Sequence, residues 1–181
     1  MLSPDEKRCL LEIARSALEN ELAGGPPAKR PVLPDDSPVF ENRGAFVTLE
    51  TDGDLRGCIG FVESRLPLWE TVAEAAAGAA TRDPRFPQVK ASELSRIRIE
   101  ISALSAPIPI QGPADIEIGR DGLIVERGPR RGLLLPQVAP EWGFGPSEFL
   151  GATCEKAGLA PDAWKKPGTA LLRFEAQVFH E

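Results

Sequence analysis

Residues 45–61 read AFVTLE-TDGD-LRGCIGF, and this stretch decides which class of fold the chain can adopt. Two apolar runs flank the pair Asp52-Gly53, and Asp-Gly between apolar runs is a strong signal for a β-hairpin. Pairing the two runs through the turn at 51–54 predicts that Val47 lies opposite Cys58. The stretch therefore predicts antiparallel sheet, with the hexapeptide 55–60 in its second strand.

Three main helices are expected along the chain. Ser3 and Glu6 form a capping box, so the first helix begins there and ends before Gly24. Apolar residues at helical spacing predict two more helices, at 67–81 and 147–157.

Further strands follow from alternation of apolar and polar side chains. Residues 96–104 alternate, which predicts a half-buried strand with Glu100 on its polar face. The last strand should carry Phe174 and Val178 on its apolar face. These further strands are expected at 96–104, 123–126, 132–135 and 171–179. The chain has no internal repeat and no strict βαβ alternation, so the predicted class is α+β with a largely antiparallel or mixed sheet.

One segment interrupts this pattern of helices and strands. Residues 23–38 contain five prolines and show no periodicity, which is typical of an extended connector at the surface. No second stretch of this kind occurs. We therefore expect residues 1–181 to form a single domain with the connector inside it.

The composition limits the chemistry that the chain can perform. Its 181 residues can bury a core without a disulfide or a structural metal, and we expect no metal site and no cofactor. The single histidine, His180, is the second-last residue, which argues against a catalytic triad, a Cys/His dyad and a two-histidine zinc site. The glycines match neither a dinucleotide fingerprint nor a P-loop.

Charge and hydropathy limit which partners and which cellular compartment are expected. A formal net charge of -6 argues against a surface built for nucleic acid. The first residues lack the apolar core of a signal peptide, and no apolar run is long enough to cross a bilayer, so no membrane association is expected. Cys9, Cys58 and Cys154 form no CxxC pair, which is in keeping with reduced thiols in a cytoplasmic protein.

The hexapeptide 55–60 is the most unusual stretch because Gly57 and Gly60 bracket a thiol within a strand. Glycine in a strand marks a bulge or the close approach of another group. In a regular strand Arg56 and Cys58 share one face about 7 Å apart, where the guanidinium would favour a thiolate and prepare an anion site. The alternative is a core cysteine facing Val47, since free cysteine is among the most buried residue types.

Two other positions are candidates for the same site. Arg85 lies on a stiff loop between two prolines, and rigid loops that carry arginine suit recognition of carboxylate or phosphate. The alternative is a surface turn anchored by Phe86. Without a nearby histidine, a general base would be water or a carboxylate such as Glu100, although ordinary solvent-facing alternation explains Glu100 equally well.

At the hexapeptide LRGCIG the chain resembles the AMMECR family, whose hallmark is matched at all six positions. Further matches are DPRFP at 83–87, EISALS at 100–105, LLPQVAPE at 134–141 and EFLGATCEKAGL at 148–159. The resemblance implies a compact α+β protein with a major and a minor lobe. It also implies component A of the AmmeMemoRadiSam system, which acts with Memo-like and radical-SAM proteins. The family has no established reaction.

Carried over by position, the resemblance gives site residues and two hypotheses. Arg56, Gly57, Cys58 and Gly60 have the best claim to a site, followed by Arg85. The leading hypothesis is a cleft that binds or transforms a small anionic or acyl ligand, with Cys58 as nucleophile or ligand contact. The alternative is a noncatalytic adaptor that docks onto Memo-like and radical-SAM partners, and the sequence leaves open whether the protein is an enzyme.

Overall fold

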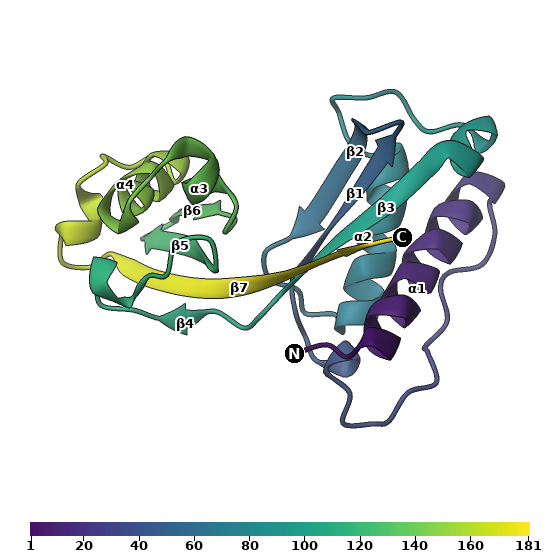
Figure 1. Cartoon of the computed structure of the whole chain (residues 1–181), viewed down its shortest axis with the longest axis horizontal. Coiled ribbons are helices and arrows are strands. Elements are labelled where there is room, and N and C mark those ends of the chain that lie inside the picture. Colours follow the sequence, from purple (N-terminus) through teal and green to yellow (C-terminus); the bar gives the residue numbers. More distant parts are fainter. The chain divides into compact units, whose positions relative to one another are not determined.

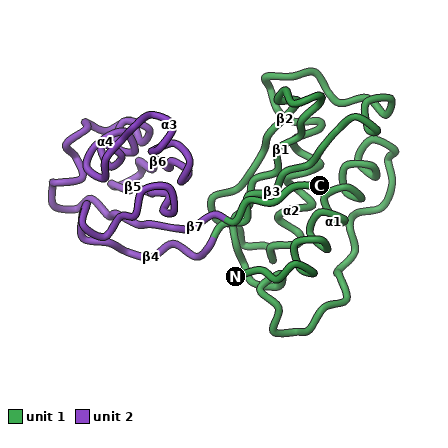
Figure 2. Tube along the Cα trace, viewed as in Figure 1, with its two compact units in different colours: residues 1–104, 177–181 green, residues 105–176 purple.

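The structure is a computed structural model that describes residues 1–181, and it divides into two compact units. Unit 1 comprises residues 1–104 and 177–181, and unit 2 comprises residues 105–176 (Figure 2). Both units combine helices with antiparallel strands, which confirms the predicted α+β class. The single domain expected over 1–181 stays a prediction. No helix has the length and apolar character that a membrane crossing requires.

Unit 1 is an antiparallel sheet with two helices against one face (Figure 1). Its strands lie in the order β2-β1-β3, followed by the end of β7. The elements are α1 (Pro4–Ala23), β1 (Ala45–Thr51), β2 (Asp54–Phe61), α2 (Leu68–Thr81) and β3 (Ile97–Leu104). The hairpin and both helices appear where the sequence predicts them, and residues 24–37 between α1 and β1 contain neither helix nor strand.

The first helix illustrates how local sequence signals set its ends. The Ser3 side chain accepts a hydrogen bond from the Glu6 N–H, and the Glu6 carboxylate accepts one from the Ser3 N–H, which is the predicted capping box. At the other end Gly24 adopts a left-handed conformation with φ of 65° and ends the helix. Between them, Leu10 and Leu18 are fully buried in the core that α1 shares with α2 and the sheet.

Unit 2 is a smaller antiparallel sheet with its own core. Strand β5 lies between β6 and β7, and β4 pairs with the other edge of β7. Phe149 and Leu150 on α4 pack with Leu123 and Val125 on β5. The elements are β4 (Ile108–Pro109), β5 (Asp121–Arg127), β6 (Arg130–Leu134), α3 (Val138–Trp142), α4 (Pro146–Lys156) and β7 (Ala170–His180).

Strand β7 does not keep the single apolar face that its alternation predicts. Leu171 belongs to the core of unit 2, whereas Phe179 belongs to the core of unit 1. Val178, expected on the apolar face, is 48% exposed, so that expectation is wrong. The strand serves two cores in turn, and its buried residues, Leu171, Phe174 and Phe179, do not follow one regular alternation.

Candidate functional site

A β-bulge at Arg56 sets the geometry of the hexapeptide. Glu50 pairs with Leu55, but the next residue of β1, Leu49, pairs with Gly57, which leaves Arg56 as the extra residue. From there on the register is shifted by one position, and Cys58 lies opposite Thr48. The predicted pairing of Cys58 with Val47 is therefore wrong.

The shift places Cys58 on the face of the sheet away from the helices. Val47 and its partner Ile59 belong to the helix-side core, while Thr48 and Cys58 alternate to the other face. Thr48 also pairs with Glu100 on β3, so Cys58, Thr48 and Glu100 form one row across three strands. All three are half-buried, and the Thr48 hydroxyl donates a hydrogen bond to the Cys58 Sγ at 3.4 Å.

The spacing of strands sets the distance between the ends of this row. Neighbouring strands lie about 4.8 Å apart, so the backbones at Cys58 and Glu100 are about 10 Å apart. The Glu100 side chain makes no hydrogen bond or ion pair within the protein. The Glu100 carboxylate and the Cys58 thiol therefore lie on the same face of the sheet but too far apart to contact each other. The carboxylate would contact a molecule bound on this face, not the sulfur.

The loop at 83–87 is bound to the outer edge of β2 at Cys58. The Asp83 carboxylate accepts the Cys58 N–H at 2.8 Å and the Arg85 N–H at 3.1 Å. It also accepts bonds from the Arg85 guanidinium, at 3.0 Å from Nε and 2.8 Å from Nη2. These bonds from Arg85 are the main reason that the pKa of Asp83 is held well below its ordinary value, although burial opposes the shift.

The Arg85 guanidinium lies beside Cys58 in this arrangement. Its Nη2 approaches the Cys58 carbonyl oxygen at 3.4 Å, and its side chain is 55% exposed. The pKa of Arg85 is raised, chiefly by its hydrogen bonds to Asp83, and the Cys58 side chain adds to that shift. The guanidinium is thus held beside Cys58 by a buried carboxylate while part of it still faces solvent.

Arg56 lies in a different setting. Its guanidinium forms a bidentate pair with Glu93, at 2.8 Å from Nε to Oε1 and 3.2 Å from Nη2 to Oε2. It also donates to the carbonyl oxygens of Pro87 and Gln88. The Arg56 side chain is only 15% exposed, and the paired arginine lowers the pKa of Glu93. These bonds position the segment that follows the 83–87 loop, and a role of Arg56 in ligand binding stays a prediction.

The two glycines of the hexapeptide have packing roles. A Cβ at Gly57 would lie 2.2 Å from the carbonyl oxygen of Ala79 on α2, so glycine lets this helix approach the sheet. A Cβ at Gly60 would lie 2.2 Å from the ring of Phe46, which covers Gly60 on the face of Cys58. Contact of either glycine with a ligand stays a prediction.

The structure brings some of the predicted residues together and adds others. Cys58 and Arg85 are in contact, and Glu100 lies on the same face of the sheet as Cys58, while Arg56 is paired with Glu93. Thr48 and Glu93 were not expected from the sequence, because neither the bulge nor the fold of the 87–93 segment has a local signal. No three side chains of His, Cys, Asp or Glu gather in a way that could hold a metal ion.

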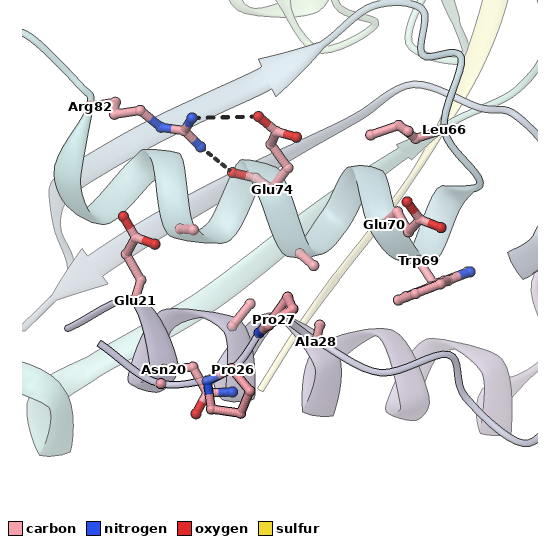
Figure 3. Close-up of a pocket in the computed structure, with 14 residues that line it drawn as sticks. Asn20, Glu21, Pro26, Pro27, Ala28, Leu66, Trp69, Glu70, Glu74 and Arg82 are labelled. Atoms are coloured by element: carbon pink, nitrogen blue, oxygen red, sulfur yellow. Dashed lines mark hydrogen bonds and ion pairs between the residues drawn. The ribbon is translucent and has the colours of Figure 1, made fainter. Parts of the chain in front are cut away.

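A separate groove of about 420 Å³ lies between α1, α2 and the connector residues 25–28 (Figure 3). Trp69, Glu70 and Glu74 of α2 line one side, and Glu74 is joined to Arg82 at 3.4 Å. Glu21 of α1 also lines it and accepts a hydrogen bond from Thr81. None of the predicted site residues lines this groove, so it is distinct from the row at Cys58.

Comparison with known proteins gives concordant results. A family model described as AMMECR1 matches residues 11–179. A protein of Methanothermobacter thermautotrophicus is 55% identical over 99% of this chain and 96% of its own length. A protein of Methanocaldococcus jannaschii is 47% identical over 100% of this chain and 92% of its own. The crystal structure of an uncharacterized protein from Pyrococcus horikoshii is 44% identical and covers 96% of this chain and 90% of its own, with a TM-score of 0.80.

Proposed function

The chain belongs to the AMMECR1 family, and on that premise we propose that it binds a small anionic or acyl ligand at the row of Cys58, Thr48 and Glu100. The observation that carries the proposal is the position of Arg85, which lies beside Cys58 and keeps 55% of its side chain exposed. A fixed cation next to a half-buried thiol is a suitable place for an anionic group.

Arg85 and the residues of the row have distinct parts in this binding. The Arg85 guanidinium balances the negative charge of the ligand, and its fork geometry suits a carboxylate or a phosphate. The Cys58 thiol contacts the ligand next to that charge and is the nucleophile that an acyl group would meet. Glu100, about 10 Å away, contacts the far end of a ligand that spans Thr48.

Two residues hold the parts of this site in place. Asp83 holds both the Cys58 N–H and the Arg85 guanidinium, so it fixes the geometry between thiol and cation. Arg56 holds the next segment through Glu93 and the Pro87 carbonyl.

The test compares an anionic and a neutral alkylating reagent on the intact chain. Iodoacetate and iodoacetamide differ mainly in charge, and peptide mapping separates modification of Cys58 from that of Cys9. Cys9 is the internal control because burial raises the pKa of its thiol, and the nearby carboxylates of Glu12 and Glu6 raise it further. We expect the ratio of iodoacetate to iodoacetamide rates to be about threefold or more higher at Cys58 than at Cys9.

A matched pair of variants assigns the effect to one side chain. Arg85→Gln should bring the ratio at Cys58 down to that of Cys9. Arg82→Gln should leave the ratio at Cys58 unchanged, because Arg82 pairs with Glu74. Arg82 is a matched control because its side chain is 56% exposed, about as much as that of Arg85. An absence of labelling at Cys58 in the folded chain, or equal ratios at the two thiols in the wild type, would overturn the proposal. Unchanged cellular function in both Cys58→Ser and Arg85→Gln would instead favour the adaptor hypothesis.

A further inference from the structure

A basic hollow lies in unit 2, at the tip of the β5–β6 hairpin. It has a volume of about 380 Å³ and is lined by Arg127, Pro129, Arg130, Leu159, Ala160, Ala163 and Lys166. Three cations and no carboxylate line this hairpin hollow, although the formal net charge of the chain is -6. Positive charge is therefore concentrated at this site in a protein whose net charge is negative.

No negatively charged group lies between the two arginines of the hairpin. Arg127 and Arg130 are direct partners across the hairpin, and like charges directly opposite each other destabilise a sheet. The Arg127 side chain makes no hydrogen bond or ion pair within the protein. Arg131, the next residue along β6, is by contrast paired with Glu126 at 2.9 Å. An anion between Arg127 and Arg130 would relieve their repulsion.

The other features of the hairpin hollow suit a bound anion. The Arg130 Nη1 donates to the Gly158 carbonyl oxygen at 2.7 Å, which positions the guanidinium and leaves its other N–H groups for a ligand. Lys166 pairs with Asp162 at 3.1 Å, but both side chains are about half-exposed, and such pairs exchange partners at little cost. Leu159 and Ala163 add an apolar wall.

We propose that the hairpin hollow binds the phosphate or pyrophosphate group of a small molecule. Arg127 and Arg130 bind the phosphate oxygens, Lys166 adds a third positive charge, and the apolar wall contacts the organic part of the molecule. The site is independent of the row at Cys58, because every residue that lines it belongs to unit 2.

The test is titration of the full chain with inorganic pyrophosphate, followed by amide chemical shifts and by calorimetry. We expect saturable binding, with shifts concentrated in the β5–β6 turn and around residue 159. Arg127→Gln should weaken it about tenfold, because a charge-assisted contact is lost. The Arg127 side chain has no partner in the fold, so this variant keeps the structure intact, as the unchanged amide spectrum of unit 1 and the core of unit 2 should show.

Lys156→Gln is the matched control, since it removes the same charge from an exposed residue of unit 2 outside the hollow. Its affinity for pyrophosphate should stay within about twofold of the wild type. No saturable binding at about 10 mM pyrophosphate, or equal weakening by Lys156→Gln and Arg127→Gln, would overturn the proposal. Tighter, salt-dependent binding of a short DNA duplex through the same residues would replace it with a nucleic-acid surface.

Discussion

Replacing Asp83 by asparagine tests whether the 83–87 loop is held on the sheet by its buried carboxylate. The Asp83 side chain is 2% exposed and accepts bonds from the Cys58 N–H, the Arg85 N–H and the Arg85 guanidinium. Asparagine has nearly the same size, but it loses the charge and turns two N–H donors toward groups that are themselves donors. The change therefore removes interactions without creating a cavity.

The expected cost follows from which of these partners can return to water. Arg85 is 55% exposed, so much of its lost pairing is recovered by hydration. The Cys58 N–H loses an ionised acceptor, and hydrogen bonds to charged groups contribute about 1.5 to 3 kcal/mol. We expect Asp83→Asn to lower the free energy of unfolding of unit 1 by about 2 kcal/mol.

Urea unfolding measures this change. Replacing Trp142 and Trp164 by phenylalanine leaves Trp69 as the only tryptophan, and its fluorescence then reports on unit 1. With a typical urea dependence, the midpoint should fall by about 1 M. Asp35→Asn is the matched control, because Asp35 also pairs with an arginine, at 3.1 Å, but is 97% exposed. Its effect should stay below about 0.5 kcal/mol.

The pH dependence gives a second signature of the same carboxylate. The pKa of Asp83 is lower in the folded chain than in the unfolded chain, so its stabilisation is fully present above the unfolded value of about 4. It is lost as the pH falls from there toward the folded value. The difference between wild type and Asp83→Asn should shrink from pH 7 to about pH 3. A gap below about 0.5 kcal/mol at pH 7, or one that does not change with pH, would refute the reasoning.

Three further changes test the packing and the ion pairs described above. Gly57→Ala places a Cβ 2.2 Å from a backbone oxygen of α2 and should cost about 2 to 3 kcal/mol in thermal unfolding, whereas Gly112→Ala, whose Cβ meets nothing within 4 Å, should be nearly neutral. Glu93→Gln removes the ionic partner of Arg56, and a loss of about 1 kcal/mol in the urea unfolding of unit 1 is expected at pH 7. Asp121→Asn removes a fully buried carboxylate, held by two arginines, from unit 2 and should cost about 3 kcal/mol, measured by the fluorescence of the unit 2 tryptophans. Wild-type stability in any of these three variants would contradict the contact that it removes.

The elements of the fold could be predicted because their signals are local. The capping box at Ser3, the turn residues Asp52 and Gly53 and the alternation in β3 each act within a few residues, and each appears in the structure. Asp52 and Gly53 have positive φ of 56° and 89°, as a tight hairpin turn requires. Local preference and the final fold therefore agree at these positions.

The register of the hairpin could not be predicted because its cause is not local. A one-residue bulge moves Cys58 from the partner Val47 to Thr48, and with it from the helix face of the sheet to the other face. The bulged residue, Arg56, is held by Glu93, which lies 37 positions further along the chain. A contact of that separation leaves no periodic trace near either residue.

The sequence assigns Cys58 and the loop of Arg85 to one candidate site, and the structure brings these residues into contact. Their binding of a ligand stays a prediction. The sequence indicates a bulge or the close approach of another group at the glycines, and at Gly57 that group is the backbone of α2. A glycine in a strand signals a close neighbour, but the sequence does not say whether that neighbour is a ligand or a helix.

The loop that holds Arg85 also has a consequence for solubility. Strand β2 ends the strand order in unit 1, and the free edge of a sheet can pair with the edge of another copy. The outward N–H and carbonyl of Cys58 are already bound by Asp83 and Arg85. The bulge at Arg56, two residues earlier in β2, interrupts the regular strand geometry. The same residues that form the candidate site therefore protect the protein from aggregation by edge-to-edge strand addition.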